Sequence, residues 1–127
     1  MKTILIDAIN TFVIKSQGID QEIFDLLESF PNRKIVLTNA TDERMEEPDF
    51  AEVPYEIFSL YNDPGKSDPG YFTMMLSHLG LEAEEVVYFE HNPEVVENAE
   101  SVGITTYLFD PKQRDFKPLK DFLETNL

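Results

Sequence analysis

The chain has 127 residues with 10 Lys or Arg against 25 Asp or Glu, and its formal net charge is -15 at pH 7. This length suits one domain with a hydrophobic core, and we expect residues 1–127 to form it. The negative charge argues against nucleic acid and anionic membranes as partners. Cysteine is absent, which excludes disulfides and thiolate chemistry. With no signal-peptide pattern and no apolar run of membrane-spanning length, we expect a cytoplasmic protein.

Short apolar runs alternate along the chain with segments of helical pattern. This alternation predicts an α/β fold, a doubly wound, three-layer domain with a parallel sheet of about five strands. The runs ILI, IVL and VVYF are continuously apolar, as is typical of central strands that helices cover on both faces. The expected strands are Thr3–Ile9, Lys34–Thr38, Glu56–Leu60, Val86–Phe89 and Ile104–Phe109.

Four segments between and after these runs carry apolar residues at helical spacing. Asp20 is a suitable N-cap for the first, and Gly80 and Gly103 follow the second and third as helix stops. The stretch from Thr41 to Pro54 reads as a loop with at most one helical turn before Pro48. The expected helices are Asp20–Phe30, Pro69–Leu79, Pro93–Val102 and a short closing helix, Pro118–Glu124.

Polar residues follow the ends of the first four expected strands. In doubly wound sheets, ligands bind outside the carboxyl ends of the strands, where strand order reverses. The residues at this edge are Asp7, Thr38 with Asn39, Lys66 and Glu90. They supply a carboxylate nucleophile, a hydroxyl and an ammonium for phosphoryl oxygens, and a second carboxylate for a divalent cation. The set therefore suits phosphoryl transfer.

These residues lie in four motifs that resemble those of the haloacid dehalogenase (HAD) superfamily. ILIDAINT resembles the first motif, a strand followed by D-x-D-x-T, with Asp7 and Thr11 in place. KIVLTN resembles the second and ends in Thr38 and an amide, and KSDP, which begins at Lys66, resembles the third. VVYFEHNPEVVENAESVG resembles the fourth, with a Glu-His pair where the family has two acids. The resemblance covers nearly the whole chain.

The resemblance implies a sheet with strand order 3-2-1-4-5 and a hydrolase site at its carboxyl edge. It implies that Asp7 is the nucleophile that attacks phosphorus, or carbon in the dehalogenases. It implies phosphate binding by Thr38, Asn39 and Lys66. Only about 30 residues separate Asp7 from Thr38, so we expect no cap domain and an open site.

Two positions depart from the family pattern. Ile9 replaces the aspartate that serves the family's phosphatases as general acid and base, a role that supplies about 10² to 10⁴ in rate, and Asn10 is a weak substitute. The resemblance implies Mg²⁺ held by Asp7, the backbone carbonyl of Ile9 and Glu90. Because Glu90 is longer than aspartate and His91 is a poor ligand for a hard cation, we expect Mg²⁺ binding that is weak or lost.

Two hypotheses for the function follow from these departures. The first is a Mg²⁺-dependent phosphatase with an Asp7 nucleophile and impaired activity. The second is a catalytically inactive HAD scaffold that binds a protein partner or a phosphorylated ligand. A phosphoacceptor receiver domain ranks last, because receivers carry the accepting aspartate after the third strand. The partner is an unspecified phosphorylated substrate or protein, and an oligomer in which a neighbouring subunit covers the open site is compatible with either hypothesis.

Each candidate also has a structural alternative. Asp7 can close a strand, and Thr38 can be an ordinary strand-end hydroxyl. Lys66 can be a solvated loop lysine, and Glu90 with His91 can be loop residues before a helix that begins at a proline. His78, on the predicted Pro69–Leu79 helix, is expected at the surface.

Overall fold

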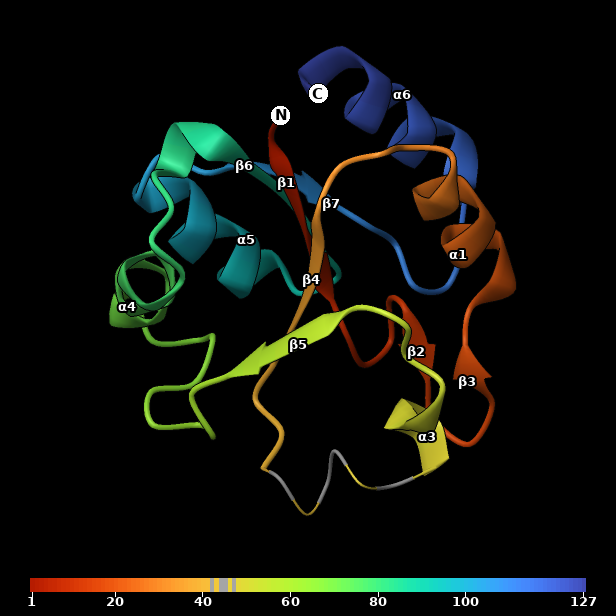
Figure 1. Ribbon diagram of the computed structural model, residues 1–127, viewed down its shortest axis with the longest axis horizontal. Coiled ribbons are helices and arrows are strands. Elements are labelled where there is room, and N and C mark those ends of the chain that lie inside the picture. Colours follow the sequence, from red (N-terminus) through yellow and green to blue (C-terminus); the bar gives the residue numbers. More distant parts are fainter. Residues whose placement is uncertain (42, 44–45, 47) are drawn as a thin grey trace.

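The computed structural model describes residues 1–41, 43, 46 and 48–127. Its main feature is a five-stranded parallel sheet in the order β5-β4-β1-β6-β7, which confirms the predicted order 3-2-1-4-5 (Figure 1). The five strands of the sheet are β1 (Thr3–Asp7), β4 (Lys34–Thr38), β5 (Glu56–Ser59), β6 (Val86–Glu90) and β7 (Thr105–Leu108).

Helices cover both faces of the sheet. Helices α1 (Gln21–Glu28) and α6 (Phe116–Asn126) lie on one face, and α4 (Gly70–Leu79) and α5 (Pro93–Ser101) lie on the other (Figure 1). Strand residues alternate between the two layers because successive side chains point to opposite faces. The α/β three-layer prediction is thereby confirmed.

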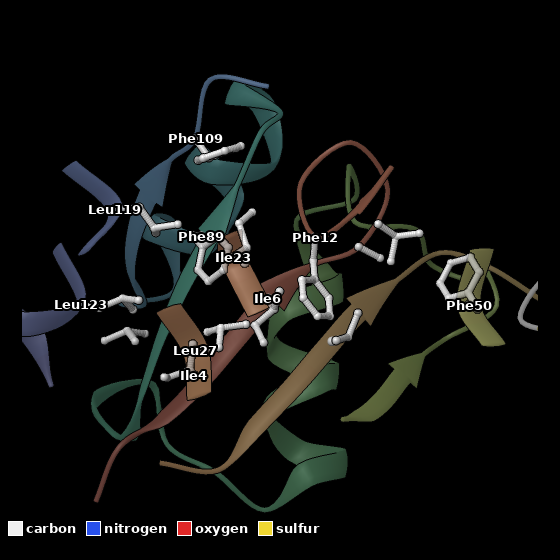
Figure 2. Packing of buried hydrophobic residues seen from close by; sticks show 14 of the residues in the cluster. Ile4, Ile6, Phe12, Ile23, Leu27, Phe50, Phe89, Phe109, Leu119 and Leu123 are labelled. Atoms are coloured by element: carbon white, nitrogen blue, oxygen red, sulfur yellow. The ribbon is translucent and has the colours of Figure 1, made fainter. Parts of the chain in front are cut away.

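The alternation is clearest in β1 and β6. Ile4, Ile6 and Phe89 pack in the cluster that contains α1 and α6 residues (Figure 2). Leu5 and Tyr88 pack in the second cluster, with α4 and α5 residues. All five side chains are fully buried, so the central strands are fixed from both sides and their carboxyl ends are held in register.

The chain leaves the first strand earlier than predicted. Strand β1 ends at Asp7 rather than Ile9, because the backbone turns and Thr11 N–H donates to the Ala8 carbonyl. A two-stranded antiparallel sheet follows, formed by β2 (Val13–Ile14) and β3 (Gly18–Ile19), which the sequence pattern did not predict. The turn therefore places residues 8–11 at the carboxyl edge of the sheet.

Some helix and strand bounds also differ from the predictions. The closing helix begins at Phe116 rather than Pro118, since Asp115 caps it and a proline is tolerated in a first turn. The short helix α3 (Pro48–Ala51) lies where a loop was expected, and a 3₁₀ turn (Ala83–Glu85) precedes β6. The helical turn expected before Pro48 falls largely outside the described residues. Strand β6 reaches Glu90, one residue beyond the prediction.

The carboxyl edge of the sheet is covered by loops. Among the residues that the structure describes, no cap is evident over this edge. Among the same residues, no helix has the length and apolar character needed to cross a membrane.

Candidate active site

Asp7 is the last residue of β1 and lies buried at the carboxyl edge of the sheet, with 2% of its surface exposed. Its Oδ1 is 2.5 Å from Lys66 Nζ, and its Oδ2 accepts a hydrogen bond of 2.6 Å from the Thr11 hydroxyl. Burial alone would raise the pKa of Asp7, but the Lys66 ammonium and the hydrogen bond from His91 hold that pKa well below its usual range. The carboxylate is therefore ionised at neutral pH.

Lys66 reaches this carboxylate from the loop between β5 and α4. Its Nζ also lies 3.0 Å from Glu90 Oε1 and 3.3 Å from the Tyr88 hydroxyl. Burial alone would lower the pKa of Lys66, but the two carboxylates raise it above its ordinary value. Lys66 is thus a buried ammonium between two acids, rather than a lysine in a solvated loop.

The loop that carries Lys66 is held by amide side chains. The backbone N–H of Lys66 donates to Asn39 Oδ1 at 2.9 Å, and Asn98 donates to the carbonyls of Lys66 and Ser67. A Cβ at Gly65 would lie 2.3 Å from Asn62 Oδ1, so a larger residue there would require the Asn62 side chain to move. These contacts fix the position of the ammonium.

Glu90 ends β6 beside Asp7, with 1% of its surface exposed. Its Oε1 accepts hydrogen bonds from the Tyr88 hydroxyl and from Lys66. Its Oε2 accepts the backbone N–H groups of His91 and Asn92, each at 3.1 Å. Since Asn92 is the N-cap of α5, the carboxylate lies at the start of that helix, where the helix dipole favours an anion.

His91 completes the cluster from the other side of Asp7. Its Nδ1 is 2.5 Å from Asp7 Oδ2 and 3.1 Å from Glu90 Oε2. The hydrogen bonds with Asp7 and Glu90 raise the pKa of His91 to about 9, against the effect of burial. We call Asp7, Lys66, Glu90 and His91 the charged cluster, in which the two acidic side chains face the two basic ones.

Thr38 ends β4 and Asn39 follows it, and both line the same pocket as the charged cluster. The Thr38 hydroxyl accepts the backbone N–H of Ala40 at 3.1 Å, which leaves its hydrogen available to a ligand. Asn39 uses its Oδ1 to hold the backbone of Lys66, so part of its role is structural. All five residues predicted at the strand ends are brought together by the fold.

The pocket has a volume of about 510 Å³ and is open to solvent. Ile9 and Asn10 line it, together with the charged cluster and the loops after β4 and β5. Among the described lining residues, the titratable groups are the four members of the charged cluster. Nothing at Ile9 can donate or accept a proton.

The side chains of the cluster can be tested against the Mg²⁺ that the resemblance implies. Ligand atoms of Asp7, Glu90 and His91 lie within 4.8 Å of one another. Lys66 contacts one oxygen of each carboxylate and leaves the other toward His91, so an imidazole nitrogen lies beside the two remaining oxygens. Mg²⁺ demands near-ideal octahedral geometry and oxygen ligands, so the two carboxylates and the Ile9 carbonyl suit it, whereas the His91 nitrogen in their midst fits it poorly.

Several residues of the site were not predicted from the sequence. Tyr88 lies within the apolar run VVYF, which gave no sign that its hydroxyl would bond Glu90. Asn98 sits on the polar side of a helix, and its contact with the Lys66 loop depends on tertiary structure. Arg114, after β7, donates to the carbonyls of Asn10 and Thr11 and so holds the turn beside Asp7.

No family model and no curated protein matches this sequence. Solved structures do match its fold. A predicted HAD-like family hydrolase from Porphyromonas gingivalis is 14% identical, with a TM-score of 0.74, over 100% of this chain and 99% of that one. A HAD family enzyme from Bacteroides thetaiotaomicron, in complex with magnesium and inorganic phosphate, is 13% identical, with a TM-score of 0.68, over 94% of this chain and 98% of that one.

A third similar structure is the N-terminal part of a Bacteroides fragilis protein, which contains a phosphatase domain complexed with Mg. It is 14% identical, with a TM-score of 0.61, over 98% of this chain and 39% of that one. At these identities the likeness establishes a fold, and the fold is that of the HAD-like hydrolases. The predicted fold-level resemblance is thereby confirmed.

Proposed function

We propose that this chain is a HAD-type phosphohydrolase in which Asp7 attacks phosphorus and forms an aspartyl phosphate. The observation that carries the proposal is the ionised Asp7 carboxylate, which lines a pocket of about 510 Å³ with an ammonium 2.5 Å away. A carboxylate nucleophile must be ionised to attack. Lys66 and the Thr38 hydroxyl line the same pocket and are suited to bind phosphoryl oxygens.

In the first step, a bond forms from an Asp7 oxygen to phosphorus while the bond from phosphorus to the leaving oxygen breaks. The leaving oxygen keeps the electron pair of that bond. In the second step, water attacks the aspartyl phosphate, inorganic phosphate departs and the Asp7 carboxylate is restored. Because Ile9 cannot accept a proton from this water, we expect the second step to be slow and the aspartyl phosphate to accumulate.

The same apolar residue restricts the substrate. An alkoxide leaving group is strongly basic and normally departs with a proton from a general acid, which Ile9 cannot supply. A carboxylate or an acidic phenolate departs without one. The proposed substrates are therefore acyl phosphates and activated aryl phosphates, and alkyl phosphates should react poorly.

A second candidate is an inactive scaffold that binds phosphate or a partner without turnover. It is favoured by the contacts of Asp7, whose two oxygens are already engaged by Lys66, Thr11 and His91. Attack on phosphorus requires at least one of these contacts to open. Ile9 also favours this candidate, because it leaves hydrolysis of the intermediate without a base.

Hydrolysis rates across a series of leaving groups test the proposal. Wild-type protein should hydrolyse acetyl phosphate and nitrophenyl phosphate in assays supplied with Mg²⁺, Mn²⁺ and Zn²⁺ in turn, with rates that fall steeply toward glycerol phosphate. Ile9→Asp should raise the rate on glycerol phosphate by about 10² to 10⁴ and change the rate on acetyl phosphate little. Ile9→Val is the matched control, because it keeps an apolar β-branched side chain.

Two outcomes would count against the proposal. Turnover that survives in Asp7→Asn would show that Asp7 is not the nucleophile. No turnover of any substrate by the wild-type protein, with turnover gained only in Ile9→Asp, would favour the inactive scaffold.

A further inference from the structure

The ligand atoms of the charged cluster differ in kind from an all-oxygen site. Asp7 Oδ2 and Glu90 Oε2 face the same atom, His91 Nδ1, at 2.5 and 3.1 Å. Both carboxylates are nearly fully buried, whereas the imidazole is about one quarter exposed and can move. A cation that enters from the pocket therefore meets two oxygens that are fixed and one nitrogen that is adjustable and that releases a proton when it binds the cation.

The remaining carboxylate oxygens are turned away from this position. Lys66 Nζ contacts Asp7 Oδ1 at 2.5 Å and Glu90 Oε1 at 3.0 Å, on the other side of both carboxylates. Asp7 Oδ2 and Glu90 Oε2 can thus turn to a cation without loss of the contacts with the ammonium. These two oxygens already accept hydrogen bonds from the Thr11 hydroxyl and from the backbone N–H groups of His91 and Asn92, so a cation must bind beside these donors or displace them. The three side chains provide an O, O, N set, which is a common environment for Zn²⁺ and other first-row transition cations.

The spacing of these atoms is compatible with such a cation after a small movement. Zn²⁺ lies about 2.0 to 2.2 Å from carboxylate oxygen and imidazole nitrogen, which in a tetrahedral site places neighbouring ligand atoms roughly 3.3 to 3.6 Å apart. The Glu90 to His91 separation of 3.1 Å must open by a few tenths of an ångström, and the Asp7 to His91 separation of 2.5 Å by about 1 Å. Rotation of the partly exposed imidazole can supply that opening.

We propose that Asp7, Glu90 and His91 form a site selective for a first-row transition cation of the Zn²⁺ type over Mg²⁺. Imidazole nitrogen raises affinity for Zn²⁺, Co²⁺ and Ni²⁺, whereas Mg²⁺ gains little from it. The identity of residue 91 is the feature that sets this preference. The inference concerns the pocket of the proposed function, but it is tested by binding alone, so either claim can fail without the other.

Equilibrium titrations of the protein with Mg²⁺, Zn²⁺ and Co²⁺, without substrate, test the selectivity. Wild-type protein should bind Zn²⁺ and Co²⁺ at least about tenfold more tightly than Mg²⁺. His91→Asp should weaken Zn²⁺ binding by at least about tenfold and strengthen Mg²⁺ binding. The matched control is His78→Asn, since His78 is the only other histidine, is exposed on α4 and should leave both affinities unchanged.

The His78→Asn protein also allows a measurement that depends on no further substitution. His91 is then the sole histidine, so a histidine-labelled sample gives one set of imidazole NMR signals. Zn²⁺ at stoichiometric concentration should shift these signals, and Mg²⁺ should not. Equal affinities for Zn²⁺ and Mg²⁺, unchanged Zn²⁺ affinity in folded His91→Asp, or imidazole signals that do not respond to Zn²⁺ would each overturn the proposal.

Discussion

The charged cluster and the rest of the pocket lining differ in the chemistry they provide. Asp7, Lys66 and Glu90 are all buried, and Lys66 forms an ion pair with each of the two acids. Contacts from separate strands and loops fix their positions. The turn at Ile9 and Asn10 lines the same pocket but offers no group that can transfer a proton. A phosphatase normally combines groups that bind and attack the phosphoryl group with a general acid. Here the binding and attacking groups are present, but residue 9 provides no general acid.

Removal of Lys66 should have the largest effect on stability, because it leaves two buried carboxylates without their cation. We expect Lys66→Met to lower the free energy of unfolding by about 3–5 kcal/mol, measured by urea denaturation. The double variant Lys66→Met with Asp7→Asn should recover part of this loss, because one buried charge is removed. A Lys66→Met protein as stable as wild type would mean that the charged cluster is not held as described.

The turn at Ile9 and Asn10 should depend for its stability on Arg114, which lies outside the pocket lining. Arg114 donates to the carbonyls of Asn10 and Thr11 and pairs with Asp20 at 2.7 Å. We expect Arg114→Ala to lower the free energy of unfolding by about 2 kcal/mol, less than Lys66→Met. Lys112→Ala, an exposed change in the same loop, is the control and should fall within about 0.5 kcal/mol of wild type. Equal effects for both variants would contradict the role of Arg114.

The pH dependence of stability tests the partly exposed member of the cluster. The pKa of His91 is raised in the folded state from 6.5 to about 9. Its contribution is therefore fully present below pH 6.5 and is lost as the pH rises through about 9. The difference in free energy of unfolding between wild type and His91→Gln should shrink across this range. His78→Gln, measured alongside, should show a difference that does not depend on pH in this way.

Much of the fold could be predicted because the signal is local and repeated. The apolar runs and helical stripes identified each strand of the main sheet and four of its helices, and the strand order followed from the resemblance. The hairpin of β2 and β3 could not be predicted, because each strand has two residues and carries no periodicity.

The site was predictable to the extent that it lies at strand ends. Asp7, Thr38 and Glu90 each end a strand of the sheet, so the topology alone brings them to one edge. The contacts of Tyr88 and Arg114 were not predictable, because they depend on side-chain directions in the folded chain. His91 was interpreted as a departure from a motif, and its contact with Asp7 became visible only in three dimensions.

The proposed function depends most directly on Asp7 as the group that bonds to phosphorus. Phosphorylation of Asp7 can be measured by intact-protein mass spectrometry after brief exposure to acetyl phosphate. Peptide mapping of a borohydride-reduced sample then locates the modified residue. We predict one added phosphoryl group per chain, located at Asp7, longer-lived than in Ile9→Asp and absent from Asp7→Asn. No adduct on a folded wild-type protein, or an adduct on a different residue, would contradict the account.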